Sequence, residues 1–219
     1  MEKVLVTGAN GLLGANIVRQ LSAKGYLVRA MLRKGSDKLS LKGAKFELFE
    51  GEITRPGDVA KAVSGCGYII HSAARTSQSP TKPEAFVKIN IEATSNLIES
   101  CKRFKVKRFV FVSTANCFTN GTINQPGNES SGFMPWLKKS GYAYSKFLAQ
   151  ENVLREVKEN SFPAIVVNPT FMIGPHDSKP SSGKLLLYGH KNRIVFYPPG
   201  GKSFVDVELA AKSICNALI

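Results

Sequence analysis

The chain has 219 residues, of which 43% are hydrophobic, and carries a formal net charge of +14. This length and apolar fraction suffice for one large folded domain. No apolar run approaches the ~20 residues of a membrane-spanning helix, and no signal peptide precedes the first apolar segment, so we expect a cytoplasmic protein without a membrane partner. The basic residues are spread along the chain instead of forming one stripe, which argues against nucleic acid as a partner.

The four cysteines are far apart and show no CxxC spacing; they are Cys66, Cys101, Cys117 and Cys215. We therefore expect reduced thiols in ordinary core positions and no metal site.

The first predicted strand, residues 4–6, runs directly into three glycines spaced by three residues, and an apolar-periodic helix follows. Strand, glycine turn and helix form the phosphate-binding start of a dinucleotide-binding unit. Gly8 lets the chain turn tightly, Gly11 lets backbone amides approach a pyrophosphate, and Gly14 lets the helix lie close to the strand. The alternative is a glycine-rich surface turn, and motifs further along the chain are needed to choose between the two interpretations.

The second predicted strand, residues 27–32, ends at Arg33 and Lys34. In folds of this kind that prefer NAD, an acidic residue near this point binds the adenosine ribose. Here no acidic residue follows until Asp37, and two cations suit a 2′-phosphate, which favours NADP(H). The alternative is a pair of solvated surface cations.

The remaining strands and helices alternate along the chain. Strands are predicted at residues 45–50, 67–72, 108–113 and 164–168, and helices at 56–64, 84–104 and 141–160. Residues 119–137 are expected to be irregular. Apolar strands that alternate with helices predict an α/β fold with a doubly wound parallel sheet.

The strand at residues 67–72 ends in small side chains, Ser72, Ala73 and Ala74. Small residues there leave room for the ribose and nicotinamide of a cofactor that crosses a parallel sheet. His71, in the same strand, is interpreted as a packed histidine and not as a catalytic base.

Tyr142 and Lys146 are four residues apart near the start of a helix, so their side chains share one face. An ammonium beside a phenol, together with an oxidised nicotinamide, stabilises the phenolate and lowers its pKa. Tyr142 could then donate a proton to a carbonyl oxygen as hydride arrives, or accept one in the reverse direction. Thr114, at the end of the fifth strand, would hold the same oxygen, and Lys146 would also bind the nicotinamide ribose. Tyr144 faces elsewhere on the helix.

In this order the motifs resemble the extended short-chain dehydrogenase/reductases, a family of NAD(P)-dependent epimerases, dehydratases and reductases. Residues 7–14 are similar to its TGxxGxxG turn, and Tyr142 and Lys146 to its YxxxK motif. Residues 113–114 fall on its catalytic Ser/Thr pair, and we place the catalytic hydroxyl on Thr114, with Ser113 as the alternative. Residues 168–175 resemble the NPxxxxGP form of dihydroflavonol-reductase-like members, whereas sugar-nucleotide epimerases more often begin this motif with Arg-Pro.

The resemblance implies a cofactor site built from most of the chain. Glu52 departs from the aspartate that the family usually places beside the adenine, and Asn90 matches a helix asparagine that supports the active site. The residues expected to bind the cofactor are Thr7, Gly8, Asn10, Gly11, Leu12, Leu13, Gly14, Arg33, Lys34, Glu52, Ile53, Ser72, Ala73, Ala74, Asn90, Tyr142, Lys146, Asn168, Pro169, Phe171 and Met172.

The resemblance covers essentially all of residues 1–219, which we expect to form one Rossmann domain, with residues 175–205 contributing to the substrate pocket. Family members continue past this point with a C-terminal substrate domain, and this chain stops within an apolar helix. We therefore expect a truncated or proteolysed product; the alternative is a natural short form.

The resemblance implies an NADP(H)-favouring oxidoreductase that acts on a small-molecule ketone, aldehyde or secondary alcohol, with NAD as a possible cofactor. The alternatives are an NAD-dependent nucleotide-sugar epimerase or dehydratase, and a non-catalytic NADP(H)-sensing module. Residues 84–104 and 141–160 resemble the helices that form family dimers, so a homodimer is expected.

Overall fold

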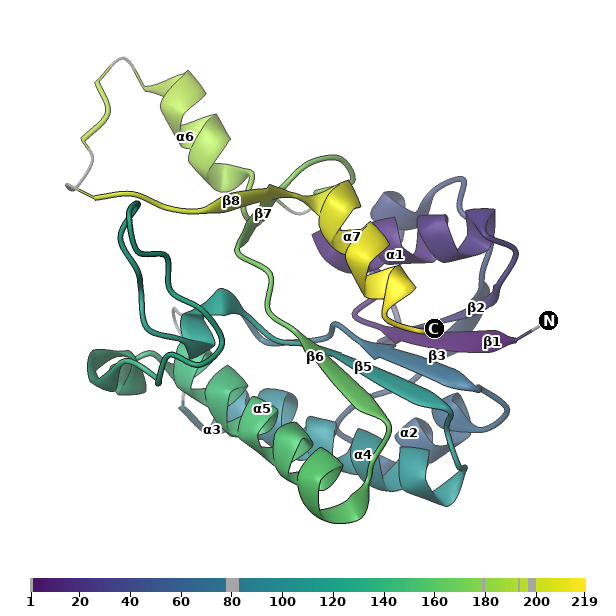
Figure 1. Cartoon of the computed structure of the whole chain (residues 1–219). Helices are drawn as coiled ribbons and strands as arrows, with labels where there is room; N and C mark the ends of the chain where they lie inside the picture. Colours follow the sequence, from purple (N-terminus) through teal and green to yellow (C-terminus); the bar gives the residue numbers. More distant parts are fainter. Residues whose placement is uncertain (1, 78–82, 179, 193, 197–199) are drawn as a thin grey trace.

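A computed structural model of the chain, which describes residues 2–77, 83–178, 180–192, 194–196 and 200–219, has a parallel sheet covered by helices on both faces (Figure 1). The strands of this sheet are β1 (Lys3–Thr7), β2 (Leu27–Leu32), β3 (Glu47–Glu50), β4 (Tyr68–His71), β5 (Arg108–Val112) and β6 (Ala164–Val167). Their order is β3-β2-β1-β4-β5-β6, and every neighbouring pair is parallel. The predicted doubly wound Rossmann fold is confirmed. The order reverses between β1 and β4, where such sheets bind ligands.

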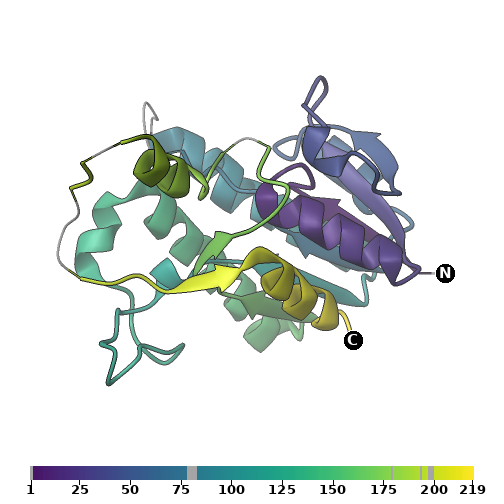
Figure 2. The same cartoon turned by 90° about the horizontal axis from the view of Figure 1, so that it is seen from above.

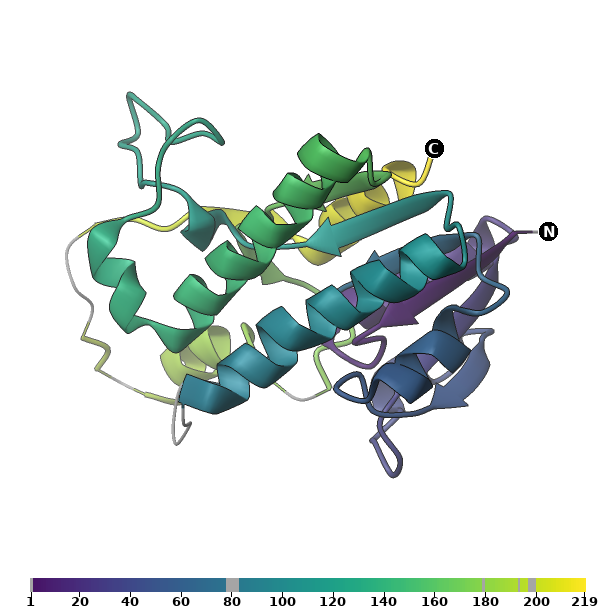
Figure 3. The same ribbon diagram turned by 90° about the horizontal axis from the view of Figure 1, so that it is seen from below.

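Helices α1 (Leu12–Ala23) and α7 (Val207–Asn216) cover one face, and α2 (Pro56–Val63), α4 (Ala93–Arg103) and α5 (Gly141–Asn160) cover the other (Figures 1 and 3). The apolar strands supply side chains to both layers in alternation. In β5, for example, Val110 belongs to the core under α1 and α7, whereas Phe109 and Phe111 belong to the core under the other helices. The four cysteines are buried free thiols, as predicted.

The helix predicted at residues 84–104 extends from Pro83 to Arg103, with a π-helical segment in its middle. This segment, Val87–Glu92, joins α3 (Pro83–Phe86) to α4 and contains the buried Asn90. Insertions of this kind occur often at functional sites because they change the direction in which a side chain points.

A second, two-stranded sheet pairs β7 (Phe171–Ile173) with β8 (Phe204–Asp206) in parallel. In Figure 1 this sheet and α6 (Lys184–Lys191) lie on the side of the main sheet that α1 and α7 cover. Asp206 caps α7, since its Oδ1 accepts the Glu208 and Leu209 amides at 2.8 and 3.0 Å.

Short 3-10 turns complete the described chain at Leu39–Leu41, Ala115–Cys117 and Pro135–Lys139. The last of these begins inside the stretch predicted to be irregular, which corrects that prediction from residue 135 onward. Within the described ranges no helix is both long and apolar enough to cross a bilayer.

Candidate active site

A cavity of about 630 Å³ opens at the carboxyl ends of β1, β2, β4 and β5, across the point where the strand order reverses. Most of the predicted cofactor-binding residues line it, namely Thr7, Gly8, Asn10, Gly11, Leu12, Leu13, Gly14, Arg33, Glu52, Ile53, Ser72, Ala73, Ala74, Tyr142, Lys146 and Met172.

The glycine turn forms one end of this cavity. A Cβ at Gly14 would lie 2.1 Å from the Gly8 carbonyl oxygen, and one at Gly8, where φ is +68°, would lie 2.7 Å from the Ala73 backbone. The protein itself therefore requires glycine at both positions. At Gly11 the nearest atom to an added Cβ is 3.4 Å away, so this glycine leaves space on the cavity side.

Helix α1 begins directly after Gly11, and no side chain caps its N-terminus. Its first-turn amides and the positive end of its dipole are therefore available to a ligand, and its first turn contains no acidic residue. A narrow glycine cradle at an uncapped helix N-terminus fits a pyrophosphate.

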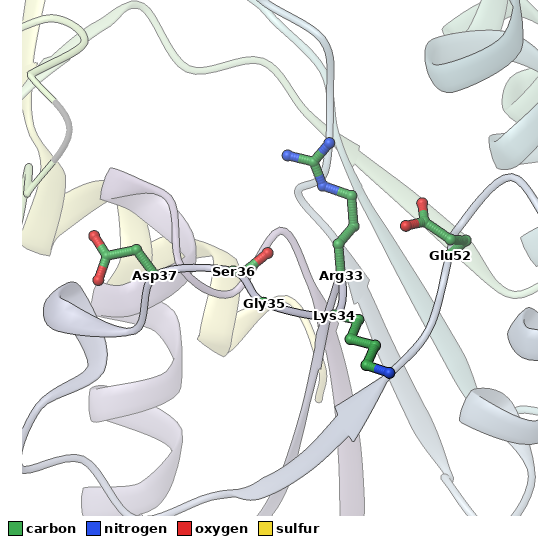
Figure 4. Close-up of a pocket in the computed structure, with 6 residues that line it drawn as sticks. All are labelled: Arg33, Lys34, Gly35, Ser36, Asp37 and Glu52. Atoms are coloured by element: carbon green, nitrogen blue, oxygen red, sulfur yellow. The ribbon is translucent and has the colours of Figure 1, made fainter.

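At the other end of the cavity Arg33 and Lys34 follow β2. They line a shallower pocket of about 350 Å³ together with Gly35, Ser36, Asp37 and Glu52. Figure 4 shows Arg33 and Glu52 on facing sides of this pocket, while Lys34 points away from Arg33. Of the two cations only Arg33 also lines the main cavity. The Glu52 amide donates to Asp58 Oδ2 at 2.9 Å, which fixes the turn that presents Glu52.

His71 is 1% exposed and is held by two threonines, as expected for a packed histidine. Its Nδ1 lies 2.7 Å from Thr7 Oγ1, and its Nε2 lies 3.0 Å from Thr94 Oγ1. Thr94 donates its own proton to the Asn90 carbonyl, so we assign the ring proton to Nε2. Burial, with a smaller contribution from Lys146, lowers the pKa of His71 to about 3.

Tyr142 and Lys146 both line the cavity from the first turns of α5. Lys146 is 2% exposed, and its ammonium donates to the Val112 carbonyl at 2.7 Å and lies 4.0 Å from the centre of the Phe111 ring. Burial lowers the pKa of Lys146 to about 7. Burial raises the pKa of Tyr142, and a hydrogen bond from the Thr114 side chain opposes that rise.

The two candidate hydroxyls at the end of β5 have different surroundings. Thr114 contacts the Tyr142 phenol, and its Oγ1 accepts the Asn116 amide at 3.3 Å, which leaves the hydroxyl proton for Tyr142. Ser113 lines the cavity, and its Oγ lies 3.3 Å from Cys117 Sγ. Thr114 therefore contacts the tyrosine, whereas Ser113 lines the cavity directly.

Asn90 does not line the cavity but connects two of its walls. Its Nδ2 donates to Ser145 Oγ on α5 at 2.8 Å and to the Arg75 carbonyl at 3.2 Å, and its Oδ1 accepts the Arg75 amide at 2.7 Å. Ser145 in turn donates to the Tyr142 carbonyl at 2.9 Å. Asn90 therefore fixes the segment after β4 against the helix that presents Tyr142.

Asn168, Pro169 and Phe171 also lie outside the cavity lining. Asn168 Nδ2 donates to the Thr114 carbonyl at 3.0 Å, and the Pro169 carbonyl accepts the Ala115 amide at 3.0 Å, so both hold the end of β5. The Phe171 ring packs edge-on against Phe204, with 5.4 Å between ring centres.

Several lining residues were not among those predicted, and two groups matter most. The first comprises Arg75 and Lys88, which flank the predicted Ala74 and Asn90 in sequence, so proximity to those motifs was the available signal. The second comprises Asp177, Ser178 and Ser181, which fall within residues 175–205, predicted to contribute to the substrate pocket. Residues 179, 193 and 197–199 of that stretch lie outside the described residues. In the part of the chain that the structure describes, no three metal-ligating side chains are grouped.

The sequence profile of the NAD dependent epimerase/dehydratase family matches residues 4–192. A sterol demethylase protein B from Methylococcus capsulatus is 32% identical over 93% of this chain and 62% of its own length. A putative anthocyanidin reductase from Ginkgo biloba is 34% identical over 84% of this chain and 60% of its own length. The crystal structure of gox2253 matches all of this chain and 66% of its own, with a TM-score of 0.91 and 29% identity. The chain thus spans about 60% of the length of these curated relatives.

Proposed function

The chain belongs to the NAD dependent epimerase/dehydratase family, and from this membership we propose that it is an NADP(H)-favouring oxidoreductase. It would transfer hydride to or from a ketone, an aldehyde or a secondary alcohol. The observation that carries the proposal is that Tyr142 and Lys146 line the same cavity as the glycine turn. An acid–base pair within reach of a dinucleotide cradle is the combination that carbonyl reduction requires.

In this proposal the glycine turn and the N-terminus of α1 hold the pyrophosphate, and the bound nicotinamide supplies the hydride. Tyr142 donates a proton to the carbonyl oxygen, and the neighbouring ammonium of Lys146 stabilises the phenolate that remains. The contacts of Lys146 with Val112 and Phe111 fix that ammonium in place. Thr114 contacts the phenol and would orient it, while Ser113, which lines the cavity, is the alternative hydroxyl for the reacting oxygen.

The preference for NADP(H) rests on Arg33, because its guanidinium lies at the end of the cavity that follows β2. A planar guanidinium suits a phosphate group. Glu52 faces the same pocket, and its negative charge would oppose an anionic group there (Figure 4). We assign the 2′-phosphate to Arg33 because Lys34 does not line the main cavity and points away from Arg33 (Figure 4).

The sequence relatives support the proposed substrate class. One of the most similar carries the name of an anthocyanidin reductase, and others are described as dihydroflavonol 4-reductases and sterol-4-alpha-carboxylate 3-dehydrogenases. We therefore propose hydride transfer at a carbonyl or secondary alcohol in preference to epimerisation of a sugar nucleotide.

A homodimer through the helices at residues 84–104 and 141–160 and a cytoplasmic location are parts of the same proposal. Leu148 and Leu154 of α5 are 36% and 45% exposed, which would suit a dimer contact.

Replacement of Tyr142 by Phe tests the proposal. We expect Tyr142→Phe to lower turnover of a carbonyl substrate by roughly 100-fold or more, since the acid–base group is lost, while binding of NADPH is retained. Tyr144→Phe is the matched control, because Tyr144 lies on the same helix and packs against Phe133 with ring centres 6.0 Å apart.

Steady-state turnover over a panel of carbonyl compounds and direct titration of NADPH give the two readouts. Unchanged turnover in Tyr142→Phe would show that Tyr142 is not the acid–base group. Tight NADPH binding without turnover of any substrate would support the sensing module instead. Interconversion of sugar nucleotides without net cofactor consumption would support the epimerase.

A further inference from the structure

Asn16 is a buried polar residue of α1 that none of the proposed roles uses. The residue is 2% exposed, and its Nδ2 donates two hydrogen bonds. One bond, of 2.9 Å, goes to the Leu12 carbonyl within the same helix, and the other, of 3.0 Å, goes to the Pro175 carbonyl. The second bond joins the phosphate-binding helix to a segment 159 residues further along the chain.

The segment that begins at Pro175 forms a wall of the cofactor cavity. Figure 2 shows the chain after β7 passing the N-terminal end of α1. Asp177 and Ser178 line the same cavity as Gly11 and Leu12, so a ligand in the glycine cradle would lie between this segment and the turn.

The backbone has a positive φ on either side of Pro175. Gly174 has φ of +152°, and a Cβ there would lie 2.5 Å from Val207 Cγ1. His176 has φ of +71°, a left-handed conformation that side chains other than glycine rarely adopt. The path of residues 174–176 therefore depends on contacts outside the segment, and the Asn16 amide supplies one of them.

Asp177 supplies the anchor on the other side. Its carboxylate accepts the Ser181 amide at 2.9 Å, the Ser181 hydroxyl at 3.0 Å and the Gly183 amide at 3.1 Å. The segment over the cavity is thus held from α1 at one end and from the start of α6 at the other.

We propose that Asn16 is a positioning residue whose amide holds residues 175–178 across the phosphate end of the cavity and thereby slows the release of the dinucleotide. This inference rests on the proposed function, because it needs a dinucleotide in the cavity. Loss of the amide lets the segment move away more often, so dissociation accelerates while association and the hydride-transfer step stay the same.

Gln20 offers a matched control on the same helix. Its Nε2 donates to the Glu208 carbonyl at 2.8 Å, so it also joins α1 to the C-terminal part of the chain by one amide–carbonyl hydrogen bond. Unlike Asp177 and Ser178, Glu208 does not line the cavity. Removal of the Gln20 bond therefore loosens the contact between α1 and α7 without releasing the cavity wall.

The test is stopped-flow measurement of NADPH release, by the change in its fluorescence, from wild type, Asn16→Leu and Gln20→Met. One hydrogen bond corresponds to about a five- to tenfold effect, so we expect Asn16→Leu to release NADPH faster by about that factor. Gln20→Met should release NADPH at the wild-type rate. Single-turnover hydride transfer should be unchanged in both variants, and the KM for NADPH should rise only in Asn16→Leu.

Asp177→Ala covers the case in which Asn16→Leu does not fold, because it removes the second anchor from a partly exposed position; it too should accelerate release. If wild type binds NADPH and the folded variants release it at the same rate as wild type, the inference is wrong and the proposed function stands. Equal acceleration in Gln20→Met would also overturn it, since the effect would then be a general loosening of α1. If wild type binds neither NADPH nor NADH, the proposed function fails and the inference falls with it.

Discussion

At the scale of single residues, the most unusual group is the buried ammonium of Lys146. It is 2% exposed and is stabilised by the Val112 carbonyl and the Phe111 ring, both of them neutral. Burial disfavours the charged form, which is why the pKa of Lys146 falls to about 7. Because the charged form of Lys146 is disfavoured in the ligand-free protein, hydrogen-bond acceptors on a bound cofactor would stabilise that form.

The lowered pKa of Lys146 predicts a pH dependence of stability. Between pH 7 and the ordinary lysine value of 10.5 the unfolded chain keeps the proton that the folded chain releases. The contribution of Lys146 to the free energy of unfolding is therefore most unfavourable below about pH 7 and improves as the pH rises, by roughly 1 kcal/mol per pH unit.

Denaturant unfolding of the ligand-free protein at pH 7, 8 and 9 checks this prediction. The difference in unfolding free energy between wild type and Lys146→Met should grow in favour of wild type over that range. Lys158→Met is the control, since Lys158 is exposed on the same helix, and should give a constant difference. A constant difference for Lys146→Met would show that its ammonium is not disfavoured by burial.

Residue-scale prediction from sequence worked where a motif encodes a local geometry. Tyr142 and Lys146 are one helical turn apart, so their shared face could be read from spacing alone. Asn16 could not be found in this way, because its partner Pro175 is 159 residues distant and no local pattern encodes that contact. The packing of the Phe171 ring against Phe204 is likewise a contact between distant residues that no local pattern encodes.

At the scale of elements, the glycine turn and α1 act as a unit in which the three glycines have separate tasks. Gly8 and Gly14 are required by contacts within the protein, whereas Gly11 is required only if something occupies the cavity. This distinction separates the effect of a substitution on folding from its effect on binding.

Gly11→Ala should therefore leave the fold intact and weaken nucleotide binding. An added methyl group has 3.4 Å to its nearest protein neighbour, and φ at Gly11 is −82°, which alanine adopts freely. We expect a loss of NADPH affinity of about tenfold or more, because the methyl group occupies the space through which the phosphate approaches the amides.

Isothermal titration of NADPH and thermal unfolding of the same samples give the two readouts. Gly57→Ala in α2 is the control; no atom lies within 4 Å of a Cβ there, so it should keep full affinity and gain slightly in stability. Full NADPH affinity in Gly11→Ala would mean that the cradle does not hold the phosphates.

Strands and long helices were predictable because they are apolar runs and apolar periodicities that tertiary packing reinforces. The π segment Val87–Glu92 was not predictable, since a short π-helical stretch within a longer helix has no distinct hydrophobic pattern. Helix α6 was missed too, and none of its residues is buried, so it lacks the one-sided burial on which such predictions depend.

At the scale of the whole molecule, the positive charge that stood out in the composition is also present in the cavity. Among the described residues, its lining contains the cations Arg33, Arg75 and Lys88, and Lys146 when it is protonated, against the acids Glu52 and Asp177. A cavity with this balance attracts an anionic ligand and raises its rate of association. A dinucleotide with an additional 2′-phosphate is such a ligand, which agrees with the preference proposed for NADPH.

Direct titration of NADPH and NADH into wild type and Arg33→Ala tests the central claim most directly. We predict saturable binding of one NADPH per chain, with NADPH bound more tightly than NADH in wild type. Arg33→Ala should lose roughly 10-fold or more in affinity for NADPH, because a charge-assisted phosphate contact is removed, and keep its affinity for NADH. Tighter binding of NADH than of NADPH by wild type would contradict the role of Arg33, and binding of neither would contradict the dinucleotide site itself.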